Sequence, residues 1–323
     1  MTKRYIETWI ATVLLVSITA ISSPAQPDHR AEAFAAQKAG KTSIAADLFR
    51  QLYKAGADDR ELLLAGSKCL ETLGRYNDAL DLLSRGKNRF PKQAEFRVGL
   101  ARVFNLQAAT MLASTGKMDN HVVFCFQDAI REGEDLLKTS PENRDARLIV
   151  ANSHYSLGEW DKVRPHAQEL VKRFPNHPGG HIIMGDLAFE HYKLLRQRAA
   201  TEGADNSKAA MQKIVGARES ARDSYAQAIK LDSKRGAAHR KLGDVYAWNG
   251  QTDQALTKYG NALLLNPRAP VPHTWISANV TPEQCSKFYE ELGKRFLASH
   301  PADKKPGAVF AWYSAAAATA SKK

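Results

Sequence analysis

The stretch LGDVYAWNGQTDQALTKYGNALLLNP, residues 242–267, decides the fold of this 323-residue chain. An apolar segment leads to a glycine, a second amphipathic segment follows, and a proline ends it. Two other stretches repeat this order: AGSKCLETLGRYNDALDLLSRGKNRFP at 65–91 and VANSHYSLGEWDKVRPHAQELVKRFP at 150–175. Because one such unit cannot bury its apolar face alone, the recurrence predicts a stack of helical hairpins.

The spacing of the turn glycines gives the length of the unit. Gly40 and Gly74 are 34 residues apart, whereas Gly74 to Gly158 is 84 residues and Gly158 to Gly250 is 92 residues. Each longer interval therefore contains one ordinary unit and one enlarged unit. The residues that close the units have matching spacings and are Pro91, Pro141, Pro175, Ser233 and Pro267. The predicted repeats are 26–59, 60–93, 94–143, 144–177, 178–235 and 236–269.

This pattern resembles that of the tetratricopeptide-repeat (TPR) family, which has L-G-x2-Y, then A-x3-F, then P over 34 residues. The resemblance covers about three quarters of the chain. It implies an all-α, right-handed superhelix (an α-solenoid) of about six helix-turn-helix repeats. Small residues recur where the two helices of each hairpin should cross. They are Ala33, Ser67, Ala101, Ala151, Gly185 and Gly243 in the first helices, and Ala45, Ala79, Ala129, Ala221 and Ala255, with Val163 as the larger exception, in the second helices.

Repeats three and five carry 16 and 24 extra residues, around 112–120 and 196–219. We predict longer helices joined by a loop, because apolar spacing continues through Leu194, Leu195 and Met211. The extensions are either tolerated insertions or a surface for a partner or for homo-oligomer formation.

The N-terminal segment predicts export. Lys3 and Arg4 precede an uncharged apolar stretch, 10–21, which is too short to span a bilayer as a helix. Small residues around Pro24 then suit cleavage after Ala25. Residues 1–25 are therefore predicted to be a signal peptide, and the mature chain to be periplasmic or secreted. A membrane anchor formed by an uncleaved N-terminus is the alternative.

The C-terminal residues 270–323 are predicted to form capping helices, which a repeat stack needs at its end. Thr281 should begin a helix, with Gln284 completing a capping box. An apolar stripe on that helix would cover the last repeat, and a final short helix should start at Pro306. The stripe consists of Phe288, Leu292 and Phe296.

Composition adds a basic excess. The formal net charge is +12. Export argues against nucleic acid as a partner, so an anionic envelope polymer, a membrane surface or an acidic protein is expected instead. The three cysteines, Cys69, Cys125 and Cys285, have neither disulfide-framework nor metal-site spacing.

Chemical motifs are weak. The segment AAQKAGKT, 35–42, satisfies a relaxed phosphate-loop pattern, but its context is helical, whereas a phosphate loop follows a strand. His154, His181 and His191 lie on the first helices of neighbouring repeats, where packed or solvated side chains are the preferred interpretation. The sequence therefore predicts no catalytic residues, no metal site and no cofactor.

The resemblance to TPR proteins also implies that first helices line a concave groove where ligands lie. When the repeats are aligned with one another, nine residues are predicted to face this groove: Lys68, Arg102, Asn105, Asn152, Tyr155, Asp186, Arg240, Asp244 and Trp248. Tyr155 and Trp248 would be apolar anchors for a protein or peptide. The predicted function is an exported scaffold or adaptor, not an enzyme. The alternative is a small-ligand or anionic-polymer-binding subunit of an envelope transport or cell-wall system.

Overall fold

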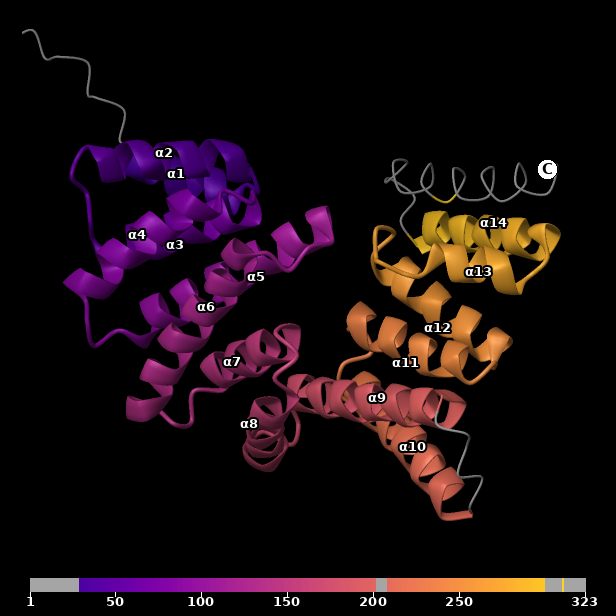
Figure 1. The fold of residues 1–323 in the computed structure, drawn as a ribbon. Coiled ribbons are helices and arrows are strands. Elements are labelled where there is room, and N and C mark those ends of the chain that lie inside the picture. The colour runs from indigo at the N-terminus through magenta and orange to yellow at the C-terminus, as the bar shows by residue number, and fades with distance from the viewer. Residues whose placement is uncertain (1–28, 202–207, 300–309, 311–323) are drawn as a thin grey trace, which may run out of the picture. The chain divides into compact units, whose positions relative to one another are not determined.

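The structure, a computed structural model, describes residues 29–201, 208–299 and 310. Over these residues the chain forms fourteen helices and no strand, and successive helices pair as hairpins (Figure 1). The predicted all-helical solenoid class is confirmed. The described residues divide into two compact units, with the boundary between Leu82 and Leu83.

The first unit is built on small residues at helix crossings. Its helices are α1 (His29–Lys38), α2 (Thr42–Lys54), α3 (Arg60–Thr72) and the start of α4 (Tyr76–Arg89). Ala33 and Ala45 are fully buried, and the ring of Phe34 meets that of Phe49 edge-on at 5.0 Å. A Cβ on Gly66 of α3 would lie 2.9 Å from the Cβ of Phe49. Glycine therefore lets α3 approach α2 closely.

The start of α3 is fixed by a side-chain cap. The Asp59 carboxylate accepts a hydrogen bond from the Leu62 amide at 3.1 Å, which satisfies one of the unpaired donors of the first turn. Arg30 of α1 lies 2.5 Å from the same carboxylate, and its hydrogen bond lowers the pKa of Asp59 below the usual value. The ion pair therefore links α1 to the beginning of the next hairpin.

The second unit begins within α4, at Leu83. Its helices are α5 (Ala94–Thr115), α6 (Asn120–Thr139), α7 (Arg144–Ser156), α8 (Trp160–Arg173), α9 (Pro178–Thr201), α10 (Lys208–Leu231), α11 (Gly236–Trp248), α12 (Thr252–Leu265), α13 (His273–Asn279) and α14 (Pro282–Ser299). From α5 to α12, each helix contacts the next one along the chain. The first helices of successive hairpins also touch, as α5 with α7, α7 with α9, and α9 with α11.

The hairpin turns use left-handed backbone conformations that glycine adopts without steric cost. The four glycines that set the spacing in the sequence all have positive φ: Gly40 at 70°, Gly74 at 71°, Gly158 at 74° and Gly250 at 73°. A fifth, Gly116, has φ 66° and ends α5. The prediction that these four glycines are turn residues is therefore confirmed.

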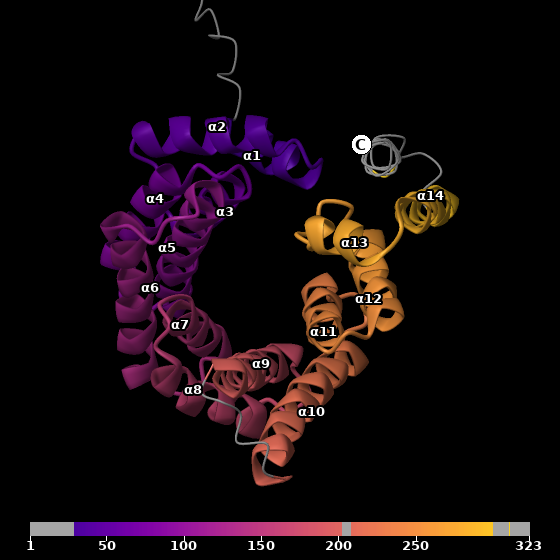
Figure 2. The ribbon, with the colours of Figure 1, turned by 45° about the vertical axis from the view of Figure 1, so that its right-hand side comes forward.

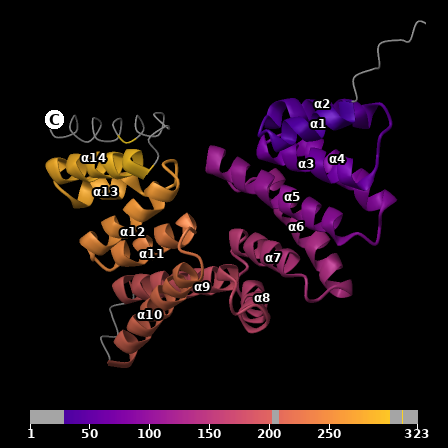
Figure 3. The ribbon, with the colours of Figure 1, turned by 180° about the vertical axis from the view of Figure 1, so that it is seen from behind.

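The two long hairpins are extended helices rather than long irregular insertions. The helices α9 and α10 have 24 residues each, against 13 and 14 in α11 and α12. Figures 2 and 3 show α9 and α10 from two further sides. Leu195 and Ile214 pack on a buried cluster that includes Tyr192 and Ala217, so the apolar spacing seen in the sequence continues into the extension. The intervening residues 202–207 lie outside the described part.

The C-terminal helix α14 covers the last hairpin. Thr281 and Gln284 form the predicted capping box, with reciprocal hydrogen bonds of 2.9 and 3.2 Å. Leu292 and Phe296 are buried in one cluster with residues of α12. Phe310 is also buried there, whereas the rest of the predicted final helix and the predicted signal peptide lie outside the described residues.

The structure describes all three cysteines, and each is a buried free thiol: Cys69 in α3, Cys125 in α6 and Cys285 in α14. Burial raises the pKa of each thiol. Within the described part of the chain, no helix combines the length and the apolar character needed to cross a membrane.

Candidate partner-binding surface

Two hairpins of the second unit share an arrangement of glycine, aspartate and tyrosine. A Cβ on Gly185 of α9 would lie 2.6 Å from Cε1 of Tyr225, which comes from α10. The Tyr225 hydroxyl donates to Oδ1 of Asp186 at 2.6 Å, and both side chains are buried. Because glycine has no side chain, the tyrosine ring reaches across the hairpin to the carboxylate on the first helix.

The next hairpin repeats this arrangement at the same repeat position. A Cβ on Gly243 of α11 would lie 2.6 Å from Cε1 of Tyr259, which belongs to α12. The Tyr259 hydroxyl donates to Oδ1 of Asp244 at 2.9 Å. Burial raises the pKa of both Tyr225 and Tyr259, so each phenol remains a hydrogen-bond donor at neutral pH.

Two cations complete this polar network. The Lys241 ammonium lies 2.5 Å from Oδ1 of Asp186 and so connects α11 to α9. Arg240 lies 2.6 Å from Oδ2 of Asp244, one turn along α11. The Lys241 ammonium also lies 5.7 Å from the ring centroid of Tyr155 on α7. The first helices α7, α9 and α11 are therefore joined by paired charges and aromatic contacts.

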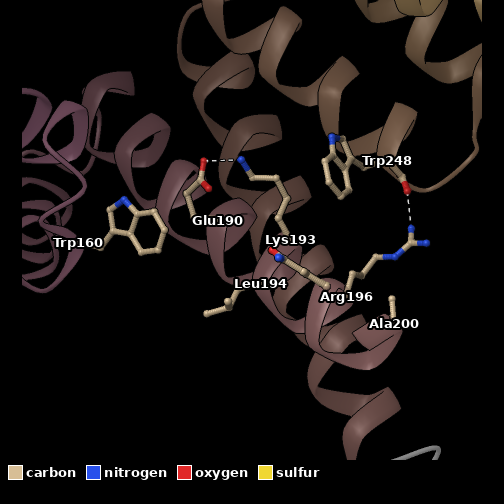
Figure 4. Close-up of a pocket in the computed structure, with 8 residues that line it drawn as sticks. Trp160, Glu190, Lys193, Leu194, Arg196, Ala200 and Trp248 are labelled. Atoms are coloured by element: carbon tan, nitrogen blue, oxygen red, sulfur yellow. Dashed lines mark hydrogen bonds and ion pairs between the residues drawn. The ribbon is translucent and has the colours of Figure 1, made fainter. Parts of the chain in front are cut away.

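The network extends along α9 towards a cavity. The Tyr155 hydroxyl donates to Oε1 of Glu190 at 2.8 Å, and the Lys193 ammonium donates to the same oxygen at 2.7 Å. Burial, followed by the nearby charge of Asp186, raises the pKa of Tyr155, which keeps the phenol protonated. These two donors hold in place the Glu190 carboxylate, which lines the cavity, and Figure 4 shows its contact with Lys193.

The cavity has a volume of about 660 Å³ and combines exposed aromatic rings with charged groups (Figure 4). Trp160, the first residue of α8, is 40% exposed, and Trp248, the last residue of α11, is 49% exposed. Arg196 donates to the backbone oxygen of Trp248 at 2.6 Å. The rings of Phe189 and Trp248 are nearly perpendicular, at 88°, with a centroid distance of 6.2 Å. The full lining is Trp160, Glu190, Lys193, Leu194, Arg196, Gln197, Ala200 and Trp248.

Of the nine groove residues predicted from the sequence, five lie in or beside this network on α7, α9 and α11: Tyr155, Asp186, Arg240, Asp244 and Trp248. Trp248 is the one among them that lines the cavity. Asp186 is only 5% exposed and is occupied by Tyr225 and Lys241, so its role here is structural.

The other four predicted residues lie elsewhere. Arg102 and Asn105 are on α5, where Asn105 donates to the Ser153 hydroxyl on α7 at 2.8 Å. Asn152 is exposed on α7. Lys68 belongs to the first unit, where it pairs with a glutamate of its own helix at 2.8 Å.

Sequence reasoning missed Trp160, Glu190, Lys193 and Arg196. Trp160 follows a turn glycine and was outside the first-helix positions that the repeat phase selects. Lys193 and Arg196 lie near or within the extension of α9, beyond the part of the helix that the 34-residue repeat aligns. One sequence signal for this surface was present. Residues 190, 193, 194 and 197 are spaced three or four apart, so they lie on one face of a helix.

Stacked helical hairpins whose first helices present charged and aromatic side chains define a helical-repeat interaction protein. A family model described as a tetratricopeptide repeat matches residues 30–94 and 216–271. Both matched ranges are therefore similar to tetratricopeptide repeats, in agreement with the helical hairpins that they form.

Two solved structures with TM-scores above 0.5 share the fold. A TPR protein from Parabacteroides merdae is 10% identical with a TM-score of 0.52, and the match covers 87% of this chain and 97% of that one. The APC/C hetero-tetramer Cut9-Hcn1 gives 15% identity and a TM-score of 0.51 over 90% of this chain and 50% of that chain. A thermophilic TPR protein from Thermus thermophilus is 18% identical, with a TM-score of 0.43 over 66% of this chain and 98% of that chain. No curated protein sequence matches.

The fold implies a scaffold for protein–protein or protein–peptide interaction. Proteins of this family are in general non-catalytic.

Proposed function

We propose that this chain is an exported adaptor that binds an extended segment of another protein on the surface formed by α7, α9 and α11. The observation that carries the proposal is the cavity lined by Trp160 and Trp248. Tryptophan is among the residues that dominate binding energy at interfaces, and both rings are substantially exposed in the free chain. Each ring therefore has apolar area that a partner would bury.

The lining indicates the chemistry of the bound segment. Leu194, Ala200 and the two indole rings suit an apolar or aromatic side chain. Lys193 and Arg196 bring two positive charges against one negative charge from Glu190, so a carboxylate of the partner is favoured beside them. We therefore expect a segment with an aromatic or aliphatic residue close to an acidic residue.

The position of the network supports binding without large rearrangement. Lys241, Asp186 and Tyr225 are already paired in the free chain, which holds α9 against α11 at the cavity. A surface that is ordered before binding loses less conformational entropy when the partner arrives. This role requires no catalytic group, in line with a non-enzymatic adaptor.

The binding test is a selection of peptides from a random library on the full-length mature chain, followed by affinity measurements on the enriched sequence. We expect Trp248→Ala to weaken binding at least about 10-fold, since central aromatic anchors cost more than 1.4 kcal/mol when truncated. Phe124→Ala on α6 is the matched control, because Phe124 is also an exposed aromatic, at 59%. Equal loss in both variants, or enrichment without any apolar residue, would reject this site.

Export is a separate part of the proposal and rests on the residues before Gln26. Expression in a bacterial host and N-terminal sequencing of the exported chain test it directly. A mature N-terminus at Gln26 supports a cleaved signal peptide. An intact N-terminus in the membrane fraction would support the anchored alternative instead.

The cavity also gives the alternative function a specific basis. Its volume falls within the range of about 300–1,000 Å³ that is typical of small-molecule sites. Native mass spectrometry of the purified chain distinguishes the two proposals: a retained small molecule that is lost in Trp248→Ala favours a ligand-binding subunit. Salt-sensitive binding to an anionic envelope polymer, unchanged in that variant, would place the polymer on another surface.

A further inference from the structure

Three consecutive helices of the second unit bring metal-binding side chains together, away from the cavity. Glu134 of α6, His154 of α7 and His166 of α8 each offer one ligand atom, and these atoms all lie within 4.8 Å of one another. The His154 ring is buried, the His166 ring is half-buried, and the Glu134 side chain is 49% exposed. The cluster thus has a buried side and a side open to solvent.

A neighbouring carboxylate orients His154. Oε2 of Glu159 lies 2.6 Å from Nδ1 of His154, and because a carboxylate only accepts, Nδ1 is the protonated nitrogen. The lone pair of the neutral ring is then on Nε2, which lies 3.7 Å from Oε1 of Glu134. A carboxylate that holds the far nitrogen of a histidine is the usual outer partner of a metal-binding imidazole.

His166, the third residue of the cluster, has a buried ring nitrogen. Its Nδ1 forms no hydrogen bond with any residue that the structure describes. The rings of His154 and His166 are 6.0 Å apart between centroids and nearly parallel, at 22°. A buried polar atom without a partner costs free energy, which a cation bound at that nitrogen would offset.

We propose that Glu134, His154 and His166 bind one divalent transition-metal ion, with Zn²⁺ the best fit, and that Glu159 is the positioning residue for His154. Two imidazoles and one carboxylate are a donor set that suits Zn²⁺ and not Ca²⁺ or Mg²⁺, which prefer oxygen ligands. Zinc bonds of about 2 Å require the ligand atoms to move slightly closer together. The exposed Glu134 side chain can supply that movement.

The fourth coordination position would face a cavity of about 410 Å³. Glu134, His154 and Glu159 line this cavity, which gives the ion a route of entry. Of the cations there, Lys138 is paired with Asp135 and Lys162 with Glu159. Two further positive groups oppose the metal: Arg131, which lines the cavity and pairs with Asp128, and Arg147, whose charge acts on His166.

Binding would tie α6 of one hairpin to both helices of the next. Its effect is therefore a stabilisation of this region by metal, independent of the peptide surface on α9 and α11. Any ion that binds only the folded state raises the melting temperature, and the stabilisation grows with the logarithm of the ion concentration relative to its Kd.

The test uses the full mature chain without a histidine tag. Co²⁺ titration should produce the visible absorption of a four-coordinate site at one ion per chain, and Zn²⁺ should displace it. Glu134→Gln should weaken Zn²⁺ binding at least about 10-fold, and Glu159→Gln by about 10-fold. Because His154 is buried and its replacement risks unfolding, Glu134→Gln and His166→Ala are the diagnostic variants.

Matched controls come from the same chain. Glu142→Gln and His191→Ala remove an exposed carboxylate and an exposed imidazole outside the cluster, and both should bind Co²⁺ and Zn²⁺ as the wild type does. Zn²⁺ should raise the melting temperature of the wild type and of both controls, and leave that of Glu134→Gln unchanged. Equal Co²⁺ spectra in His166→Ala and His191→Ala, or a Zn²⁺ effect that survives Glu134→Gln, would overturn the proposal.

Discussion

The hairpins α9–α10 and α11–α12 differ from α5–α6 and α7–α8 at the position where their helices cross. In the later pairs, glycine on the first helix faces a tyrosine on the second, as with Gly185 and Tyr225. In the earlier pairs, alanines take the glycine positions, and the positions equivalent to the tyrosines are Gly133 and Ala167. The same repeat therefore reaches close helix contact in two ways, by small residues on both helices or by glycine opposite a large ring.

The difference has a consequence for buried polar groups. The large ring carries a hydroxyl that pairs with Asp186 or Asp244, so the tyrosine hairpins satisfy their carboxylates inside the hairpin and across to Lys241. The alanine hairpins have no such hydroxyl at that position. The partly buried histidine pair of α7 and α8 instead faces a carboxylate from α6. In the tyrosine hairpins the buried carboxylates already have partners within the protein. In the α7–α8 hairpin the two histidines and the carboxylate from α6 could instead bind a metal ion.

The largest expected effect comes from removing one tyrosine. Tyr225→Ala should lower the free energy of unfolding by about 3–5 kcal/mol, the range for truncating a buried aromatic ring. Tyr225→Phe should cost about 1–3 kcal/mol, because the ring stays while Asp186 loses a hydrogen bond. Chemical denaturation followed by circular dichroism measures both. If the two variants are equally stable, the ring does not pack as described.

Exchanging the small residues tests the crossing itself. Gly243→Ala should destabilise by about 1–3 kcal/mol, because the new Cβ would press on Tyr259. The reverse change at the equivalent position, Ala151→Gly, should cost about 1 kcal/mol through helix propensity alone. Thermal melts of both variants provide the comparison. A stabilised Gly243→Ala variant would show that the tyrosine moves away at no cost.

Alkaline pH should affect the tyrosine hairpins selectively. Tyr225 and Tyr259 have pKa values raised by burial, so the stability they contribute is complete below pH 10, the ordinary tyrosine value, and falls as pH rises above it. At pH 11 we expect a loss of about 1 kcal/mol per tyrosine. Hydrogen exchange and tyrosinate absorbance locate the effect. The Tyr259→Phe variant should lose less stability over the same range than the wild type does.

The smallest effect on stability is expected at the cavity. Trp248→Ala should change the free energy of unfolding by only about 0.5 kcal/mol, since its ring is half exposed and lies outside the tyrosine–aspartate pairs. A thermal melt of this variant checks the value. A loss comparable to that of Tyr225→Phe would mean that the ring supports the fold rather than a partner.

The fold could be predicted from the sequence because its determinants are local and periodic. Turn glycines such as Gly74 and Gly250 recur at intervals that can be counted along the chain. Small residues likewise recur at the same position of each repeat, where its two helices cross. The capping box at Thr281 was equally visible, since its two partners are three residues apart. Each of these signals involves residues that are neighbours on one helix or at one turn.

The sites were harder because their residues come from different helices. The repeat phase selects residues of first helices, such as Trp248 and Tyr155, and therefore passes over Trp160, which begins a second helix. His154 was compared with His181 and His191, whereas the structure places it beside His166 and Glu134, 12 and 20 residues away. Such a cluster depends on how α6, α7 and α8 pack. Spacing along one helix carries no signal for it.

The three buried thiols offer a way to time the opening of separate parts of the chain. Cys69, Cys125 and Cys285 lie in α3, α6 and α14, and each is protonated and shielded while its helix is packed. A thiol reagent can modify such a cysteine only when the local structure opens, so the rate of labelling at each one reports the free energy of that local opening. Mass spectrometry of the labelled peptides would therefore rank the first unit, the third hairpin and the C-terminal cap by their dynamics, with no mutation in the chain.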